Sequence, residues 1–279
     1  MKPILVFQTD FTYKEGAVSS MYGVVKSVDR ELEIFDSTHE IPNYDIWSAS
    51  YRLFQPFIFW PKGTIFVSVC DPGVGTPRRA SIAKTKNGYY VVTPDNGTLT
   101  HVKAKYGIEK IVEIDIDRHR LKGYGTENIS VFHGRDVFGY CAAKLASGQV
   151  AFEDFGNEYP VEEIVTFDLL EPKQSDDAIE GVAEIIDPNF GNLWSNVPIS
   201  WLEQWQGKQV QVSVINQEQE TIFNESIPLN LTFGEVAKGQ LTIYQNEYGN
   251  AAIAVNQGSL INQYAIEYGP HVKIIFRGE

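Results

Sequence analysis

The chain has 279 residues, of which 43% are hydrophobic and 21% charged, the composition of a globular protein with a sizeable core. Its formal net charge is −13, which disfavours nucleic acid and anionic membranes as partners because both reward a basic face. Two cysteines cannot build a disulfide framework, and no CxxC or Cys/His cluster indicates structural zinc. Because the N-terminus lacks a signal-peptide pattern and no apolar run reaches transmembrane length, we expect a cytoplasmic protein with no membrane partner.

The first part of the chain alternates short apolar runs with helical patterns. Strands are expected at residues 4–8, 32–36, 64–69 and 110–114, and helices at residues 16–28, 45–54, 99–106 and 136–146. Asn87-Gly88 is a strong turn signal and predicts a β-hairpin within residues 81–92. Alternating β and α elements favour a layered α/β domain.

The pattern changes near a polar stretch at residues 171–177, which we interpret as a linker. Beyond it, short strand signals dominate, at residues 210–214, 241–245, 251–255 and 272–276. This spacing indicates a small all-β, barrel-like domain. We therefore expect an α/β domain over residues 1–172 and a β-barrel domain over residues 177–279.

The apolar run at residues 64–69 leads directly into the sequence Cys-Asp-Pro-Gly-Val-Gly-Thr-Pro-Arg-Arg at residues 70–79. Its glycines permit positive φ and close approach to a ligand, and its prolines stiffen the turn. Ligands of α/β sheets bind in the crevice beyond the carboxyl ends of the strands, so Asp71 and Arg78 are candidates for a polar site. An ordinary turn with a surface ion pair explains this segment equally well.

Three other loops carry the same kinds of side chain. Asp10 follows the first strand, where its carboxylate could hold both hydroxyls of a ribose or cap a helix. His133 lies in Phe-His-Gly-Arg-Asp at residues 132–136, where a helix is expected to begin. Residues 187–194 place an acid, aromatic rings and amides close together, a set suited to gripping an amphipathic ligand.

Six segments, taken in order, resemble the S-adenosyl-L-methionine (SAM) hydroxide adenosyltransferase family, the SAM hydrolases, which is related to the fluorinase and chlorinase enzymes. They are Thr-Asp-Phe at residues 9–11, Asp-Ser-Thr-His at 36–39, the loop at 71–79, Pro-Asp-Asn-Gly at 94–97, the loop at 132–136 and Asp-Pro-Asn-Phe-Gly-Asn at 187–192. Each segment alone is a weak signal, but six in family order are a strong one. The resemblance implies a homotrimer whose active sites lie between one subunit's N-terminal domain and a neighbour's C-terminal domain.

The resemblance also implies roles for particular residues. It places the catalytic residues at Asp71, Arg78 and His133. In the halide enzymes, uncharged residues replace the acid and the histidine, and serine takes the position of Gly134, so this sequence falls on the hydroxide side. The ribose diol is expected on Asp10.

Further substrate-binding positions are implied in both domains. An aromatic wall is expected at Tyr44 and the methionine amine at Asp187. The adenosyl and adenine contacts are expected at Phe190, Asn192, Phe233, Glu247, Tyr248, Asn256 and Gln257. Glu247-Tyr248 departs from the serine-arginine pair of the halide enzymes.

The expected reaction is hydrolysis of SAM to adenosine and L-methionine by direct attack of water on the ribose 5′ carbon. A sulfonium releases a neutral thioether, so the reaction needs a positioned water and a base but no general acid. We expect no metal and no cofactor. Three alternatives remain open: halide adenosyl transfer, a non-enzymatic adenosine or SAM sensor, and a metallohydrolase that uses Asp10, Asp71, His39 and His133.

Overall fold

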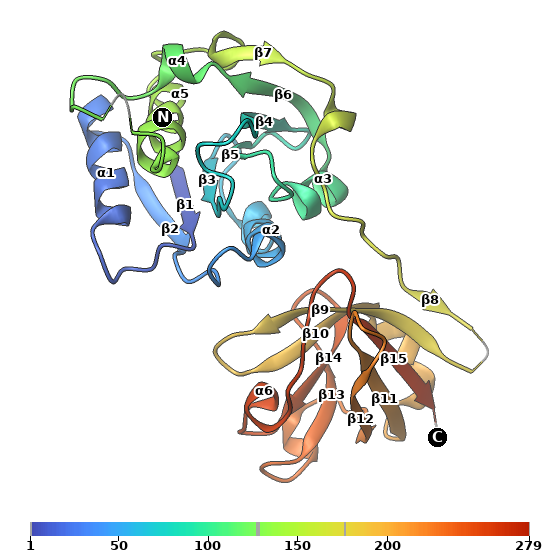
Figure 1. Ribbon diagram of the computed structural model, residues 1–279. Coiled ribbons are helices and arrows are strands. Elements are labelled where there is room, and N and C mark those ends of the chain that lie inside the picture. The colour runs from blue at the N-terminus through green and yellow to red at the C-terminus, as the bar shows by residue number, and fades with distance from the viewer. Residues whose placement is uncertain (1, 127–128, 176, 279) are drawn as a thin grey trace. The chain divides into compact units, whose positions relative to one another are not determined.

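The computed structural model describes residues 2–126, 129–175 and 177–278, and the chain divides into two compact units between Phe167 and Asp168 (Figure 1). Each unit has its own hydrophobic core. The polar stretch expected as a linker is partly structured, because Lys173–Gln174 form strand β8 and pair with β9 of the second unit.

A single mixed sheet forms the centre of the first unit. Its strands are β1 (Leu5–Thr9), β2 (Ile34–Thr38), β3 (Ile65–Val69), β4 (Ala80–Thr85), β5 (Tyr90–Pro94), β6 (Ile108–Ile114) and β7 (Gly156–Glu158), in the spatial order β2-β1-β3-β5-β4-β6-β7. Strands β2, β1, β3 and β5 are parallel, and the remaining pairings are antiparallel. The hairpin expected around Asn87-Gly88 is confirmed as β4–β5, with Gly88 at φ 92°.

Helices cover both faces of this sheet. They are α1 (Ala17–Val28), α2 (Ile46–Phe54), α3 (Thr100–Tyr106), α4 (Ile116–His119), the π-helical segment η2 (Gly134–Gly139) and α5 (Tyr140–Ala146), with 3₁₀ turns η1 (Phe57–Phe59), η3 (Phe152–Phe155) and η4 (Val161–Glu163). None of the helices in the described residues is long and apolar enough to cross a membrane.

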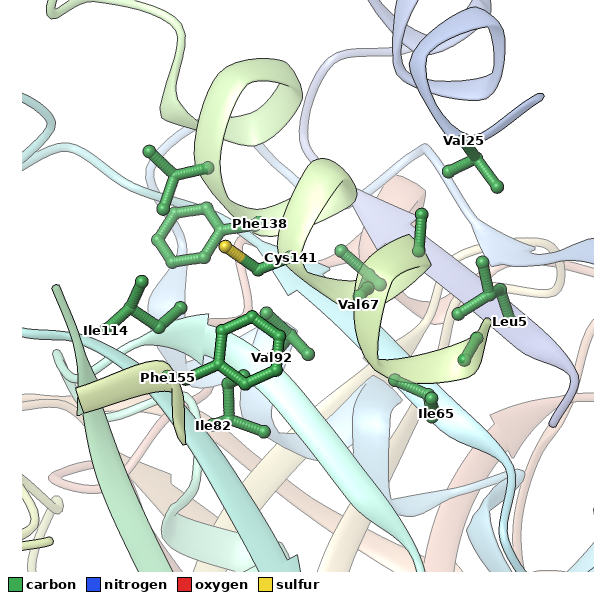
Figure 2. Packing of buried hydrophobic residues seen from close by; sticks show 14 of the residues in the cluster. Leu5, Val25, Ile65, Val67, Ile82, Val92, Ile114, Phe138, Cys141 and Phe155 are labelled. Carbon is green, nitrogen blue, oxygen red and sulfur yellow. The ribbon is translucent and has the colours of Figure 1, made fainter. Parts of the chain in front are cut away.

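Successive residues of β1 and β3 point to opposite faces of the sheet, and both faces are buried. On one face, Phe138 and Cys141 pack over strand residues such as Val67 and Val92, as Figure 2 shows. On the other face, Leu53 of α2 and Val102 of α3 belong to a second apolar cluster. The layered α/β architecture expected from the sequence is therefore confirmed.

The helix expected at residues 136–146 differs in its first part. Residues Gly134–Gly139 form π-helical turns, and α-helical geometry begins only at Tyr140. Amphipathic spacing revealed the buried face but not this local widening of the helix. π-Helical insertions concentrate at functional sites, and this one directly follows His133.

The second unit is built almost entirely of antiparallel strands. They are β8 (Lys173–Gln174), β9 (Ile179–Asp187), β10 (Asn192–Pro198), β11 (Gln209–Ile215), β12 (Thr221–Pro228), β13 (Leu241–Gln245), β14 (Asn250–Val255) and β15 (Lys273–Gly278), with short helical elements η5 (Ile199–Trp205), η6 (Phe233–Glu235) and α6 (Leu260–Gln263). The order is β12-β11-β15-β9-β10-β14-β13. A bridge between Leu229 and Ile243 links the chain beyond β12 to β13, so the sheet is nearly closed and barrel-like, as expected.

Candidate active site

Two acids lie just beyond the carboxyl ends of neighbouring parallel strands in the first unit. Asp10 directly follows β1, and Asp71 lies two residues beyond β3. Strands β1 and β3 pair in parallel register up to Thr9 and Val69. The topology therefore brings both carboxylates to one edge of the sheet, where α/β proteins place their ligand sites.

The loop from Asp71 to Arg78 folds back on itself. The backbone N–H of Val74 donates to the carbonyl of Asp71 at 3.2 Å, and that of Thr76 donates to the carbonyl of Gly73 at 3.1 Å. Gly75 adopts φ 78°, a left-handed conformation that glycine takes without strain. These turns return the chain so that the Arg78 side chain reaches Asp71.

Arg78 bridges the other two residues that the sequence singled out for catalysis. Its Nε donates to Oδ1 of Asp71 at 3.0 Å, and its Nη2 donates to Oδ2 of the same carboxylate. The same Nη2 lies 3.0 Å from Nδ1 of His133. The Arg78 and Asp71 side chains are only 10% and 5% exposed, so this is a largely desolvated ion pair whose planar geometry fixes both groups.

Burial and the contact with Arg78 together favour the neutral form of His133. Burial lowers the pKa of the imidazole, and the adjacent guanidinium charge lowers it further. Arginine has only donors, so Nδ1 must accept, and a neutral ring then carries its proton on Nε2. At neutral pH His133 is therefore an uncharged donor at Nε2.

Asp10 lies beside this cluster with one of its oxygens already engaged. The backbone N–H of Tyr44 donates to Oδ2 at 3.0 Å, and the thiol of Cys70 contacts the same oxygen at 3.6 Å. Oδ1 accepts no hydrogen bond from the described residues. Cys70 immediately precedes Asp71 and is itself fixed by Asn96, whose side-chain N–H₂ donates to its carbonyl at 2.9 Å.

Tyr44 presents its backbone, rather than its hydroxyl, to Asp10. It is a non-glycine residue at φ 68°, a strained conformation that concentrates at functional sites. Its side chain is 70% exposed, and helix α2 begins just after it with Asp45 as the N-cap. The Tyr44 backbone therefore lies against Asp10, and the aromatic wall expected at this position stays a prediction.

Aromatic rings connect the Asp10 loop to the His133 loop. Phe11 packs edge-to-face against Phe132 with a centroid separation of 5.8 Å. A Cβ atom added at Gly134 would lie 3.0 Å from the Phe11 ring and 3.2 Å from the Phe132 ring. Glycine at this position therefore lets the two loops approach closely.

In the second unit, predicted binding residues gather around Tyr244, which the sequence did not single out. Trp194 donates through Nε1 to the Tyr244 hydroxyl at 3.0 Å, and the Asn192 side chain bonds to the same group. The Phe233 ring lies 4.6 Å from that of Tyr244. Burial raises the pKa of Tyr244, and the nearby carboxylates of Asp187 and Glu247 raise it further.

The remaining predicted residues of this unit shape its loops. The Asp187 carboxylate accepts the backbone N–H of Asn189 at 3.1 Å, which fixes the β9–β10 turn and leaves Phe190 66% exposed. Asn256 donates to the carbonyl of Val236 at 2.8 Å and so holds the loop that follows Phe233. Tyr248 packs against Trp194 at 6.1 Å, and Gln257 is exposed in the turn after β14.

Two acidic positions noted in the sequence have structural roles. Asp95 is buried and accepts hydrogen bonds from the Tyr159 hydroxyl and the Val165 backbone. Asp136 is fully buried and is paired with Arg135. Across residues 2–126, 129–175 and 177–278, no three His, Cys, Asp or Glu side chains are grouped to hold a metal ion.

Sequence reasoning missed Tyr244 and the structural role of Cys70. Tyr244 occupies strand β13, whose sequence pattern identifies a strand but not which partly buried ring meets Trp194. Cys70 follows an apolar run and therefore resembles an ordinary core residue. Its place beside Asp10 results from the pairing of β1 with β3.

Comparison with known proteins agrees with this architecture. Residues 5–156 match the SAM hydroxide adenosyltransferase N-terminal domain, and residues 181–273 match the corresponding C-terminal domain. A Methanocaldococcus jannaschii protein named (R)-S-adenosyl-L-methionine hydrolase is 33% identical over 70% of this chain and 66% of its own length. A Thermus thermophilus protein of the same name is 29% identical over 99% of this chain and 100% of its own.

Halide enzymes and solved structures are also similar. Proteins named fluorinase match at 23% to 26% identity over 98% of the chain. The crystal structure of an uncharacterized conserved protein from Thermotoga maritima superimposes with a TM-score of 0.85 at 30% identity, covering 98% of this chain and 100% of that one.

Proposed function

Since this chain belongs to the SAM hydroxide adenosyltransferase family, we propose that it hydrolyses S-adenosyl-L-methionine to adenosine and L-methionine. The observation that carries the proposal is the buried Asp71–Arg78–His133 cluster. A site of this kind suits attack by water on the ribose 5′ carbon, because the neutral thioether leaves without protonation. The chemistry then requires a water held in line and a group that accepts its proton.

The geometry of the cluster supports different roles for His133 and Asp71. With Nδ1 of His133 facing Arg78, the Nε2–H is free to donate to a water oxygen and orient it. The Asp71 carboxylate retains lone pairs beyond those that Arg78 occupies, and it takes the water proton. Nη1 of Arg78 is buried without a hydrogen-bond partner among the described residues. It therefore supplies one more N–H donor to the proposed site.

Substrate binding is assigned to residues of both units. The free Oδ1 of Asp10 accepts the ribose hydroxyls, and the Tyr44 ring forms a wall beside them. Asp187 binds the methionine amine, while Phe190, Asn192, Phe233, Glu247, Tyr248, Asn256 and Gln257 contact the adenosyl group. The Trp194–Tyr244 pair supports the second set, because it fixes Asn192 and Phe233 in one cluster.

We further propose that the site is completed in a homotrimer, with the second unit contributed by a neighbouring subunit. The family resemblance supports this assembly. The exposure of Tyr44, Phe190 and Phe233, at 70%, 66% and 40%, leaves large rings available on both units.

Halide transfer is the rival reaction within the fold. A carboxylate beside the nucleophile repels an anion and favours water, and the water site that we propose includes the Asp71 carboxylate. The serine that the halide enzymes carry at position 134 would crowd the Phe11 and Phe132 rings in this chain. Both observations favour hydroxide transfer.

The test is incubation of the purified protein with SAM and chromatographic separation of the products. We expect adenosine and L-methionine in equal amounts, without added halide and at an undiminished rate in EDTA, since we propose no metal or cofactor. Oxygen from ¹⁸O-labelled water should enter the adenosine 5′ hydroxyl. Accumulation of 5′-halo-adenosine alone would establish the rival reaction, and binding without turnover would establish the sensor.

A further inference from the structure

A buried imidazole that the proposed reaction does not use lies directly behind the Asp10 loop. His39 follows strand β2, its side chain is 0% exposed, and both of its ring nitrogens have partners. Nδ1 lies 2.8 Å from Oγ1 of Thr9, and Nε2 lies 3.1 Å from Oδ1 of Asp36. His39 therefore links the end of β1 to a carboxylate on its neighbouring strand.

The hydrogen-bond directions along this chain are mutually consistent. With its proton on Nε2, His39 donates to Asp36, and Nδ1 then accepts from the Thr9 hydroxyl. The Thr9 oxygen in turn accepts the backbone N–H of Phe11 at 3.1 Å. No donor or acceptor along this path is left unsatisfied, which is what rigidifies a buried polar network.

His39 holds the loop on both sides of Asp10. Before Asp10, its ring contacts Thr9, and after Asp10, its backbone carbonyl accepts the N–H of Thr12 at 2.8 Å. Asp10 therefore lies between two residues, Thr9 and Thr12, that are both hydrogen-bonded to His39. Its carboxylate is fixed at Oδ2 by Tyr44, so the orientation of Oδ1 depends on the backbone that His39 anchors.

Two tyrosines hold Asp36, which forms the end of the network away from Asp10. The hydroxyls of Tyr13 and Tyr22 both donate to Asp36, and the Tyr22 oxygen also lies 3.0 Å from Nε2 of His39. Burial opposes ionisation of Asp36, but these hydrogen bonds and that of His39 outweigh it and lower the pKa of the carboxyl. Asp36 is therefore a permanent acceptor for the imidazole at neutral pH.

We propose that Thr9 and His39 are positioning residues that aim Oδ1 of Asp10 at the ribose diol, an inference that rests on the proposed function. They touch no substrate and act only through the backbone around Asp10. A residue that merely stabilised the fold would affect all ligands equally, whereas a residue that aims Oδ1 affects only ligands that carry the diol.

The experiment measures binding of adenosine and of 2′,3′-dideoxyadenosine by calorimetry. The readout is the dissociation constant of 2′,3′-dideoxyadenosine divided by that of adenosine, which is large when the protein prefers the diol. In the Thr9→Val protein, which removes the hydroxyl without changing the shape of the side chain, we expect this ratio to fall by roughly tenfold, the effect of one well-placed hydrogen bond. Thr9→Ser keeps the hydroxyl and should retain the wild-type ratio. A folded Thr9→Val protein with an unchanged ratio would overturn the proposal.

A second pair of variants addresses the imidazole and replaces the first pair if Thr9→Val does not fold. His39→Asn keeps an acceptor at the place of Nδ1, and His39→Gln keeps a donor at the place of Nε2 but loses the contact with Thr9. The proposal expects the ratio to fall further in His39→Gln than in His39→Asn, and equal ratios would contradict it.

The outcomes separate the two proposals. Wild-type protein that hydrolyses SAM but shows no preference for the diol overturns the positioning role alone. Wild-type protein that prefers adenosine, loses this preference in Thr9→Val and leaves SAM intact supports the positioning role and overturns the hydrolase. Absence of binding to either nucleoside and of SAM turnover overturns both.

Discussion

Nη2 of Arg78 lies 3.0 Å from Nδ1 of His133, although 55 positions separate the two residues in the sequence. The same nitrogen donates to Asp71, so one guanidinium orients both proposed water contacts. In the reaction we propose, Nε2 of His133 donates to the water and Asp71 accepts its proton.

The first prediction concerns the shape of the Arg78 side chain rather than its charge. In Arg78→Lys, a single ammonium cannot contact both Asp71 oxygens and His133 together, so kcat should fall by about a hundredfold while the affinity for SAM changes little. Stopped assays for turnover and calorimetry for affinity provide the two values.

Arg79→Lys is the matched control. Arg79 is the next residue and pairs with Glu163 and Asp95 outside the cluster, so its variant should turn over normally. Equal losses in the two variants would mean that the loop, rather than the bridge made by Arg78, determines the rate.

The second prediction is the pH dependence. Burial and the Arg78 charge lower the pKa of His133 below its ordinary value of 6.5, so the ring should stay neutral, and kcat/KM should not decline, until the pH falls below 6.5. The same shift means that the contribution of this ring to folding stability is present above pH 6.5 and is lost as the pH falls.

Titration of the histidine ring signals by NMR checks this directly, with the His133 resonance assigned by its absence in His133→Asn. In Arg78→Met the nearby charge is gone, and the pKa of His133 should rise. A His133 that titrates at or above 6.5 in the wild-type protein would contradict the arrangement.

The third prediction concerns the close packing at Gly134. In Gly134→Ser, the added atoms meet the Phe11 and Phe132 rings, so both turnover and the thermal midpoint should fall, with a destabilisation of about 1–3 kcal/mol. Gly23→Ser is the control, because that helical glycine has no atom within 4 Å of an added Cβ. Calorimetric scans of both variants give the comparison. A fully active and stable Gly134→Ser protein would contradict the prediction, because it would show that the Phe11 and Phe132 rings move aside without cost.

The fourth prediction tests the shared site. Asp71→Ala and Phe233→Ala chains should each be inactive as separate preparations, because one lacks the base and the other an adenosyl contact. Mixed trimers should regain part of the activity, because some interfaces then combine an intact first unit with an intact second unit. Light scattering verifies the trimer, and well-mixed trimers that stay inactive would favour a site within one subunit.

The sequence by itself determined the layers and the residue types of the site. Apolar runs and their spacing identified β1, β3 and the hairpin at Asn87-Gly88, because these signals are local. The succession of Asp71, two glycines and Arg78 likewise predicted a polar loop after a buried strand. These patterns can be recognised from residues that are close together in the sequence.

Only the tertiary structure decided which side chains meet. The Arg78–His133 contact, the bond between Cys70 and Asp10, and the ring of Tyr244 beside Trp194 depend on strand pairing and on packing between distant segments. The π-helical turns after His133 were likewise not predicted, since the periodicity of apolar residues does not distinguish a π-helix from an α-helix over so short a segment. Local pattern fixes an element and its buried face, whereas the geometry of a site depends on contacts whose partners lie far apart in the chain.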